Sequence, residues 1–519
     1  MINAVGREIP DELLKDEKEV YQGKFYMDGK YVKKDSPRTK RYETPRESKI
    51  FKSIREACEK CGAHDGMTFS FHSDFRNGDY VASMVAKVLV EEMGLKDLTI
   101  AATSLGSAQD LIAEYIEAKK VIGIQTSGVR GRIGEVISAG KLKTPAIIRS
   151  HGGRPRAIEA GEVHIDIAFL AASTSDCYGN AKGTGGKNNC GSMGFAVPDS
   201  HYADHVVVIT DTLVDFPNHP ATISSIDVDC VCIVDSVGDP AKISTLEARM
   251  TDNPRELMMA ENVANVIAAT PYFKAGYSFQ TGVGGPSLAV NRFLEKHMVE
   301  KDITMGFALG GMGSAICQLQ DKGLVKHLLD TQDFDKGAIE HLATHPNHHE
   351  ICTSQYANPA NKGAYVNKLD FVVLAALEID TKFNVNVITG SDGVLRGAPG
   401  GHPDTAAGSK CCIIVTPLVR GRMATVCKNV VTVTTPGDCV DVLVTDYGIA
   451  VNPLRPDLIE CLDKDGIAHV TVESLQEKAY SLVGTPDDLE WEDKVIAIVE
   501  ARDGTILDVV RKIKPLQLD

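Results

Sequence analysis

The sequence has no apolar run approaching the length of about 18 residues that a membrane-spanning helix needs. Its start, Met-Ile-Asn-Ala-Val-Gly-Arg-Glu, lacks the basic-then-apolar pattern of a signal peptide. Positive charge is also scarce, since 55 lysines and arginines face 70 aspartates and glutamates, giving a formal charge of −15. This balance argues against nucleic acid or an anionic membrane as the main partner, but it leaves room for a local basic pocket. We therefore expect a cytoplasmic protein that binds neither nucleic acid nor membrane.

Paired cysteine motifs are also largely absent. The 13 cysteines are scattered, odd in number and mostly in apolar surroundings, which is typical of reduced, buried thiols. Histidines gather at positions 341, 345, 348 and 349 with a spacing that a metal site can use. Pro346 separates them, and no carboxylate pattern completes a site. We interpret this patch as a loop edging the active site and expect no metal site in the chain.

One sequence pattern occurs twice at a constant offset. Leu170-Ala-Ala…Asp176…Asn180 returns as Leu374-Ala-Ala…Asp380…Asn384, and flanking segments repeat in the same order. A repeat of this length predicts one domain used twice. The chain length of 519 residues and the 43% of hydrophobic residues also fit two or three domains with substantial cores.

Short apolar runs alternate with segments of helical periodicity, which is typical of an α/β fold with largely parallel sheets. We expect an extended N-terminal arm over 1–50, a first domain over 51–262 and a second over 263–519, completed by the tail 440–519. The predicted strands are 67–71, 98–102, 121–125, 165–172, 206–209, 277–280, 303–307, 371–376 and 411–415, with helices at 80–93, 108–118 and 288–297.

Glycine-rich turns lie next to several of these strands, at 128–134, 150–154, 282–286, 310–313 and 397–404. Glycine lets the backbone come close to a ligand and turn its N–H groups toward an anion. One such turn is a weak signal. Five in one chain favour a site for an anion or for the oxyanion of a reacting thioester.

The run Gly400-Gly-His-Pro-Asp404…Gly408-Ser-Lys410…Ile413-Ile-Val415 resembles the Gly-Gly-x-x-Asp…Gly-Ala-Lys-x-x-Ile-Val signature of the second half of coenzyme A transferases. Asp176-Cys-Tyr-Gly-Asn180, Ala376-Leu-Glu-Ile-Asp380 and Val442-Leu-Val-Thr-Asp446 resemble other segments of that superfamily. The resemblance extends from about residue 60 to 515. It implies two tandem coenzyme-A-transferase-like domains of the ribose-phosphate-isomerase-like type.

Two further runs, 126–135 and 393–402, are similar to the citrate lyase alpha-chain family within that superfamily. This likeness implies a citrate CoA-transferase that exchanges acetyl for citryl on a thioester and releases acetate. The thioester is acetyl-CoA or the CoA-derived group of a carrier protein, and no cofactor is bound permanently. The implied partners are citrate, an acyl-carrier protein subunit and a lyase beta subunit in a hetero-oligomeric complex. The alternatives are a CoA transferase or acyl-CoA hydrolase acting on another carboxylate such as citramalate, or a carrier-binding scaffold.

One segment departs from the superfamily pattern. Typical coenzyme A transferases carry Glu-Asn-Gly-x-x-Gly after the second strand of the second domain, and that glutamate attacks the acyl thioester. The corresponding run here is Ala308-Leu-Gly-Gly-Met-Gly313, which places Ala308, give or take one residue, where the glutamate would be. Alanine cannot act as a nucleophile. We therefore expect direct attack by a citrate carboxylate within a ternary complex, with the protein supplying alignment and charge stabilisation.

The candidate site residues fall into three groups. The expected catalytic residues are Gly310, Gly311, Gly400 and Gly401, whose amides would face an oxyanion, and His402, which would donate to it or hold the thiol. The expected citrate-binding residues are Arg130, Arg132, Arg154 and Arg396, because arginine binds carboxylates bidentately. The expected thioester- or carrier-binding residues are Gly282, Gly284, Gly285 and Asp404.

Each group also has a structural alternative. The arginines can be solvated surface residues, and the ring of His402 can bond to a nearby carbonyl. Asp404 can cap the segment that follows it.

Overall fold

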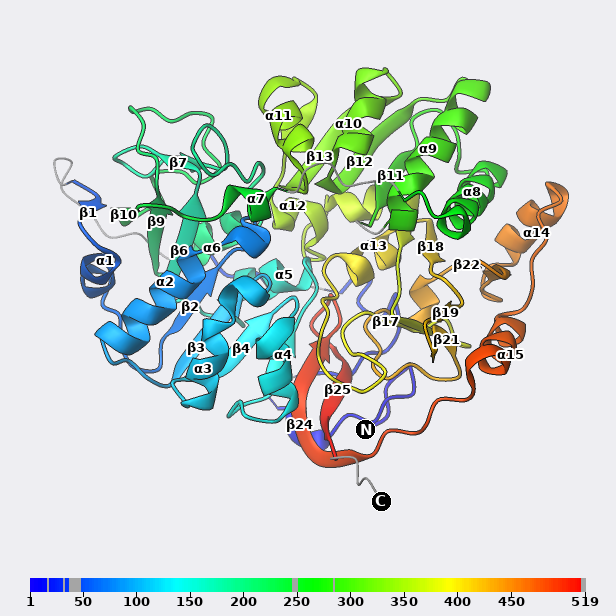
Figure 1. The fold of residues 1–519 in the computed structure, drawn as a ribbon, viewed down its shortest axis with the longest axis horizontal. Coiled ribbons are helices and arrows are strands. Elements are labelled where there is room, and N and C mark those ends of the chain that lie inside the picture. Colours follow the sequence, from blue (N-terminus) through cyan, green and yellow to red (C-terminus); the bar gives the residue numbers. More distant parts are fainter. Residues whose placement is uncertain (16–17, 31–32, 37–47, 245–250, 283–284, 515–519) are drawn as a thin grey trace.

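The computed structural model describes residues 1–15, 18–30, 33–36, 48–244, 251–282 and 285–514. The chain forms two halves that lie side by side, each with a mostly parallel sheet flanked by helices (Figure 1). The strands of the first half are β1 (Ile50–Phe51), β2 (Thr68–Phe71), β3 (Leu98–Ala102), β4 (Val121–Thr126), β5 (Ala146–Ile148), β6 (Ile167–Ala172), β7 (Thr174–Ser175), β8 (Ala181–Lys182), β9 (His205–Thr210) and β10 (Cys230–Ile233). Its helices are α1 (Ile54–Lys60), α2 (Val81–Lys87), α3 (Leu111–Glu117), α4 (Gly131–Ser138), α5 (Gly153–Glu159), α6 (Ala196–Tyr202) and α7 (Pro240–Ile243).

The second half is built from the same kinds of elements, strands that alternate with helices. Its strands are β11 (Ser278–Thr281), β12 (Met305–Met312), β13 (Val325–Asp333), β14 (His348–Glu350), β15 (Phe371–Leu374), β16 (Glu378–Asp380), β17 (Val385–Asn386), β18 (Cys411–Val415), β19 (Val419–Arg420), β20 (Met423–Ala424), β21 (Val426–Cys427), β22 (Val442–Thr445) and β23 (Gly448–Val451). Its helices are α8 (Pro254–Ala269), α9 (Gly285–Glu300), α10 (Ser314–Asp321), α11 (Lys336–Thr344), α12 (Thr353–Ala357), α13 (His402–Gly408), α14 (Pro456–Lys464) and α15 (Val472–Val483). A last pair of strands, β24 (Trp491–Glu500) and β25 (Ile506–Ile513), ends the described chain.

The two sheets repeat one strand order. The first contains β9-β6-β2-β3-β4-β5 and the second β18-β15-β11-β12-β13-β14, so strands of equal rank along the chain occupy equal places. Neighbouring strands within each of these runs are parallel. The prediction of an α/β fold with largely parallel sheets is confirmed, and the repeated order is what a domain used twice would give.

The C-terminal hairpin corrects one expectation. Strand β24 runs parallel to β5, with Ala497 opposite Ala146, and β25 pairs with β24 in antiparallel fashion. The tail therefore completes the second half only up to α15, because residues 491–513 extend the first sheet. The burial of apolar side chains explains this placement, since Ile496 and Val499 lie in the core of the first half. The hairpin thereby covers the edge strand β5.

Two more of the predicted limits can be compared with the structure, the boundary between the domains and the N-terminal arm. The boundary between residues 262 and 263 falls inside α8, whose Met259 and Ile267 are buried in the core of the second half. The N-terminal arm packs on the C-terminal hairpin, where Ile9 and Val20 form a small apolar cluster with Ile506. Among the described helices, none has the length and apolar character that crossing a membrane requires.

Candidate functional site

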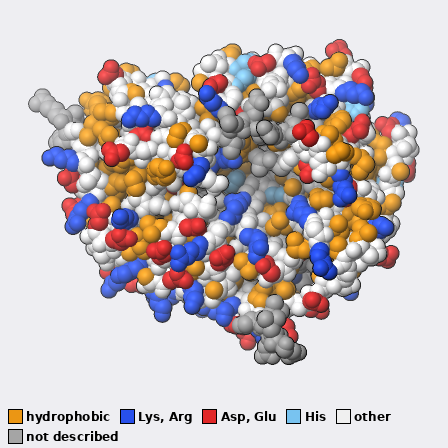
Figure 2. All heavy atoms as spheres, viewed as in Figure 1, with side chains coloured by type: hydrophobic (Ala, Val, Ile, Leu, Met, Phe, Trp, Pro, Cys, Tyr) orange, Lys and Arg blue, Asp and Glu red, His pale blue; other side chains and the backbone are white. Residues whose placement is uncertain are grey.

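The glycine-rich turns of the two halves meet at the seam between the sheets. The N–H of Val129, after β4, donates to the carbonyl of Gly397 at 3.1 Å, and the N–H of His151, after β5, donates to Gly400 at 2.8 Å. A Cβ at Gly128 would overlap the Cβ of Ala398, so only glycine allows this approach. Figure 2 shows the seam as a hollow in the middle of this face of the molecule.

Two of the predicted oxyanion glycines lie around one buried Tyr–Gln pair. The Nε2 of Gln280, on β11, donates to the hydroxyl of Tyr356, on α12, at 2.9 Å. A Cβ at Gly310 would lie 2.7 Å from that Nε2, and a Cβ at Gly401 would overlap the tyrosine oxygen. Gly310 has a φ of +102°, which glycine adopts without strain. The turn that ends β12 and the turn that precedes α13 therefore meet at Tyr356.

The other two oxyanion candidates are arranged differently. Gly400 has a φ of +54°, and a Cβ there would lie 3.5 Å from Cε1 of His151. Gly311 faces the ring of Phe334 instead of the Tyr–Gln pair. The ladder between β12 and β13 shifts register between Gly310 and Gly311, and a Cβ at each would meet different neighbours.

The predicted thioester-binding glycines lie at a neighbouring place. Gly282 and Gly311 line a small cavity of about 20 Å³ between β11, β12 and the start of α9. Gly285 is the first residue of α9, and Gly284 lies outside the described residues. Thioester binding by these glycines stays a prediction.

His402 does not have a free ring nitrogen in this structure. Its Nε2 lies 3.1 Å from the carbonyl oxygen of Ala375 and its Nδ1 lies 2.7 Å from the hydroxyl of Thr435. A carbonyl only accepts, so Nε2 donates and Nδ1 accepts from the threonine. Burial lowers the pKa of His402 to about 4, which keeps the ring neutral. This arrangement matches the structural alternative and leaves no hydrogen-bonding group of the ring for a substrate.

Three of the four predicted citrate arginines are already paired with carboxylates. Arg154 forms a bidentate pair with Asp199 at 2.6 and 2.8 Å, and both side chains are buried. Arg132 bonds to Glu114 and Glu117 on the surface, and Arg396 bonds to Asp392. These three guanidinium groups therefore already have protein partners in this structure, and citrate binding by the four arginines stays a prediction.

Arg130 is the exception within this group. Its turn is exposed, and its Nη1 lies 3.4 Å from the hydroxyl of Ser104. The positive charges of Arg130 and Arg154 add to the effect of burial in lowering the pKa of His151 to about 3. Arg130 follows Val129, which bonds to Gly397, so this exposed residue lies in a turn at the seam.

Asp404 joins the two halves. Its carboxylate accepts from the hydroxyl of Ser150 at 2.8 Å and from the N–H of Gly152 at 2.9 Å, across the seam. Burial raises its pKa to about 6, against the opposing effects of Arg502 and of these bonds. Asp404 therefore fixes the first turn of α13 to the start of α5, a structural role in place of the predicted thioester contact.

The repeated Asp…Asn pattern is a local scaffold in both halves. Asn180 donates from Nδ2 to Asp176 at 2.7 Å, and Asn384 donates to Asp380 at 3.1 Å. In each copy the aspartate also accepts from the N–H of its own asparagine. The same side chains also accept from the N–H groups of Asn218, Ser225 and Gly437, so each pair ties its turn to a neighbouring loop.

Three residues near the seam, and Arg420 on β19 of the second half, were not among the predicted site residues. His151 belongs to a predicted glycine turn, and its ring packs edge-on against Phe195 at 4.6 Å. Gln280 and Tyr356 gave no sequence signal, because their pairing depends on the meeting of β11 and α12. Arg420 is half-buried, and its Nη2 lies 3.1 Å from the hydroxyl of Thr416.

A larger cavity lies beneath the N-terminal arm. It has a volume of about 350 Å³ and is lined by residues of the arm, of α13 and of the loop between β24 and β25. Arg502 lines it and lies 3.7 Å from Asp404, the residue that joins the halves. A cavity of this size can hold a small ligand, and the sequence gave no indication of it.

Comparisons with known proteins agree on one family. The family model "Citrate lyase, alpha subunit (CitF)" matches residues 47–513. The citrate lyase alpha chain of Haemophilus influenzae is 51% identical over 471 residues, which cover 91% of this chain and 94% of the relative. A solved structure described as an alpha subunit of citrate lyase from Streptococcus mutans, in complex with citrate, is 47% identical. It has a TM-score of 0.96 and covers 99% of this chain and 100% of that one.

A more distant structure shares the fold alone. The alpha subunit of a malonate decarboxylase from Acinetobacter baumannii has a TM-score of 0.63 at 16% identity, over 85% of this chain and 94% of the other. Taken with the near full-length matches at about half identity, the conclusion concerns descent and not only shape. This chain belongs to the citrate lyase alpha-subunit family.

Proposed function

We propose that this chain is a citrate CoA-transferase, the subunit of a citrate lyase that exchanges acetyl for citryl on a thioester. The observation that carries the proposal is the meeting of the Gly310 and Gly401 turns at Tyr356. The chain also belongs to the citrate lyase alpha-subunit family, and the solved structure of a similar protein is described as a complex with citrate. Backbone amides gathered at one point can stabilise the oxyanion of an acyl transfer. The seam between the halves is the place we propose for this reaction.

The reaction begins with the attack of one citrate carboxylate oxygen on the acetyl thioester carbonyl. The carbon–sulfur bond breaks, the thiolate leaves, and a citryl–acetyl mixed anhydride remains. The thiolate then attacks the citryl carbonyl, and acetate leaves with its electron pair and with one oxygen that came from citrate. No proton is consumed overall, so alignment and charge stabilisation are the main requirements.

A covalent route through the protein has no nucleophile at the expected position. Ala308 is 3% exposed and packs in the core of the second half. The nearby Asp404 is held by Ser150 and Gly152. This supports direct transfer within a ternary complex.

The charged and polar groups at the seam have separable tasks in this proposal. Arg130 and Arg420, which bond to hydroxyl groups, would hold carboxylates of citrate. Gln280 donates to Tyr356 at 2.9 Å, and the phenol donates back to Oε1 of Gln280 at 3.4 Å, a weak bond that it would exchange for one to a developing oxyanion. Burial raises the pKa of Tyr356, so the phenol stays protonated. The amides of Gly310, Gly400 and Gly401 complete the site in the proposal.

The family name also implies an assembly. We propose an acyl-carrier protein subunit as the donor of the thioester and a lyase beta subunit as the enzyme that cleaves the citryl product. The full reaction would yield acetate and oxaloacetate. Gly282 and Gly285, beside the small cavity, remain our candidates for contact with the thioester or its carrier.

A single-turnover experiment tests both the activity and the route. The purified chain is mixed with acetyl-CoA and citrate labelled with ¹⁸O in its carboxylates, and products are read by mass spectrometry. We expect equal amounts of citryl thioester and acetate, with one labelled oxygen in the acetate. Acetate without citryl thioester would contradict a transferase, and an acyl-enzyme trapped by hydroxylamine would contradict the ternary complex.

A glycine variant tests the proposed place. In Gly401→Ala the new methyl group overlaps the Tyr356 oxygen and must displace the turn or the tyrosine. A displacement near 1 Å at a reacting centre costs about 100-fold in rate. Gly363→Ala is the matched control, because a Cβ there meets no atom within 4 Å. Equal rates for the two variants would place the reaction elsewhere.

A further inference from the structure

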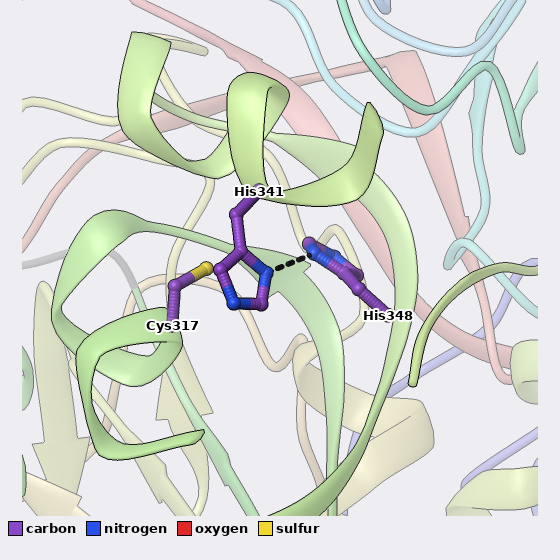
Figure 3. Close-up of side chains that lie close together, drawn as sticks. All are labelled: Cys317, His341 and His348. Atoms are coloured by element: carbon purple, nitrogen blue, oxygen red, sulfur yellow. Dashed lines mark hydrogen bonds between the residues drawn. The ribbon is translucent and has the colours of Figure 1, made fainter. Parts of the chain in front are cut away.

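A cysteine and two histidines come together in the second half, where Cys317 lies one helical turn after the glycine turn at 310–313. Cys317 lies on α10, His341 on α11 and His348 on β14. One ligand atom of each lies within 4.8 Å of the others. Figure 3 shows the sulfur of Cys317 beside the ring of His341, whose Nδ1 faces the ring of His348.

These side chains are shielded from water. Cys317 is 3% exposed, the side chain of His348 is 0% exposed and that of His341 is 10% exposed. The Nε2 atoms of both histidines are buried and make no hydrogen bond to the described residues. A buried polar cluster of this kind is costly unless a partner satisfies it.

The orientation of the two rings is the more specific observation. The Nε2 of His348 lies 3.5 Å from Oδ2 of Asp330, and the Nε2 of His341 lies 3.4 Å from Oδ1 of Asp321. A carboxylate next to Nε2 favours the proton on that nitrogen, which leaves Nδ1 as a lone pair. The two Nδ1 atoms, however, face each other at 2.9 Å. Two lone pairs at this distance repel unless a proton or a cation lies with them.

The geometry points to a metal site, and we propose that Cys317, His341 and His348 bind one zinc-class divalent cation through Sγ and the two Nδ1 atoms. Thiolate and imidazole ligands select zinc, which is four-coordinate, so a water would take the fourth place. Bonds of about 2.0–2.3 Å hold tetrahedral ligand atoms roughly 3.3–3.8 Å apart. The two Nδ1 atoms, 2.9 Å apart, are closer than this, so binding would move the rings apart by about 0.4 Å or more, with Sγ already within 4.8 Å of both. The earlier expectation of no metal site is thereby revised.

The surrounding acidic groups fit this assignment. Asp330 and Asp321 would receive the Nε2–H groups and orient the rings, as carboxylates beside metal-bound histidines do. A thiol loses its proton when a metal–thiolate bond forms, so binding at Cys317 would release a proton from the sulfur.

The site would tie three elements of the second half together. Strand β14 is the edge strand of the second sheet, and α10 and α11 pack beside it. The next strand, β13, carries Asp330 and Asp333, and Asp333 accepts from the N–H of Ser192 in the first half at 3.0 Å. A cation here would stabilise the folded chain without touching the transferase site.

Metal binding to the full chain tests the proposal directly. Chelator-treated protein is titrated with Co²⁺, and we expect about one equivalent to bind, with tetrahedral visible bands and a near-ultraviolet thiolate-to-cobalt band. Zinc should raise the melting temperature, because it binds the folded state. X-ray absorption spectroscopy at the zinc edge, on the unaltered chain loaded with zinc, should show one sulfur among nitrogen or oxygen ligands. No uptake, or a shell without sulfur, would overturn the proposal in favour of a proton shared within the cluster.

Variants locate the site. Cys317→Ser should lose the thiolate band and His348→Gln should lose stoichiometric binding. Asp321→Asn, at an exposed carboxylate, should weaken binding by about 10-fold or more through His341. His349→Gln is the control, since His349 faces His327 on the exposed side. A thiolate band that persists in Cys317→Ser, or equal losses in the His349 control, would place the metal at other residues.

Discussion

Both halves carry a Pro-Asp pair in the first turn of a helix, Pro198-Asp199 in α6 and Pro403-Asp404 in α13. Both carboxylates are fully buried, and both reach the same short segment, residues 150–154. Asp199 binds the guanidinium of Arg154 within its own half. Asp404 crosses the seam and accepts from two neutral donors. The same local motif thus stabilises one half internally and joins that half to the other.

The residue before each proline shows a second difference. The first half has the aliphatic Val197 there, and the second half has His402, which bonds to Ala375 and Thr435. The two halves also differ in the groups that we propose they supply to the seam. In our proposal the first half supplies Arg130 to the seam, while the second supplies the glycine amides. The duplicated frame is therefore shared, and the groups placed on it have diverged.

The largest expected effect concerns the Pro-Asp pairs. Arg154→Leu removes the partner of buried Asp199 and leaves an uncompensated charge, which costs about 3–5 kcal/mol of unfolding free energy. Asp404→Asn keeps an acceptor oxygen and loses one hydrogen bond to the carboxylate and the contact with Arg502 at 3.7 Å, but it also relieves the burial of a charge, so we expect a net cost of about 1 kcal/mol. Urea unfolding of both variants at neutral pH measures the difference. Equal costs would show that the two aspartates have the same role, against the contrast drawn from their partners.

Fold and site differ in how far the sequence predicts them. Apolar runs such as 98–102 and 411–415 coincide with β3 and β18, because burial on a parallel sheet leaves a local apolar pattern. The glycine turns were found because close approach requires glycine. The partner of Arg154 was not predictable, since Asp199 lies 45 residues away along the chain. Nor does any local pattern show that 491–513 joins the first sheet.

The next largest effect is a pH dependence that arises from His402 in the second half. Burial lowers the pKa of His402 to about 4, below its ordinary value of 6.5. The neutral ring therefore contributes stability that is fully present above pH 6.5 and is lost as the pH falls through 4. The full change corresponds to about 3 kcal/mol. The difference in unfolding free energy between the unaltered chain and His402→Gln should shrink by this amount across that range.

Measuring a difference is necessary because Asp404 acts in the opposite direction. Its pKa is raised to about 6, so its contribution is present below its ordinary pKa and is lost as the pH rises through 6. His201→Gln in α6 of the first half, where the ring is half-exposed, is the control. A pH-independent difference for His402→Gln would mean that the ring is not held neutral.

The smallest effect tests the division of charge between the halves. If Arg130 holds a citrate carboxylate, Arg130→Ala removes a charged hydrogen bond, and the KM for citrate should rise by about 10-fold or more while the KM for the thioester is unchanged. Arg132→Ala is the neighbouring control, because Arg132 is occupied by Glu114 and Glu117 on the surface. Arg502→Ala tests the alternative place for citrate, the cavity beneath the N-terminal arm, because Arg502 lines that cavity. A rise in the citrate KM with Arg502→Ala, and none with Arg130→Ala, would move the substrate from the seam to that cavity and assign the binding charge to the C-terminal hairpin.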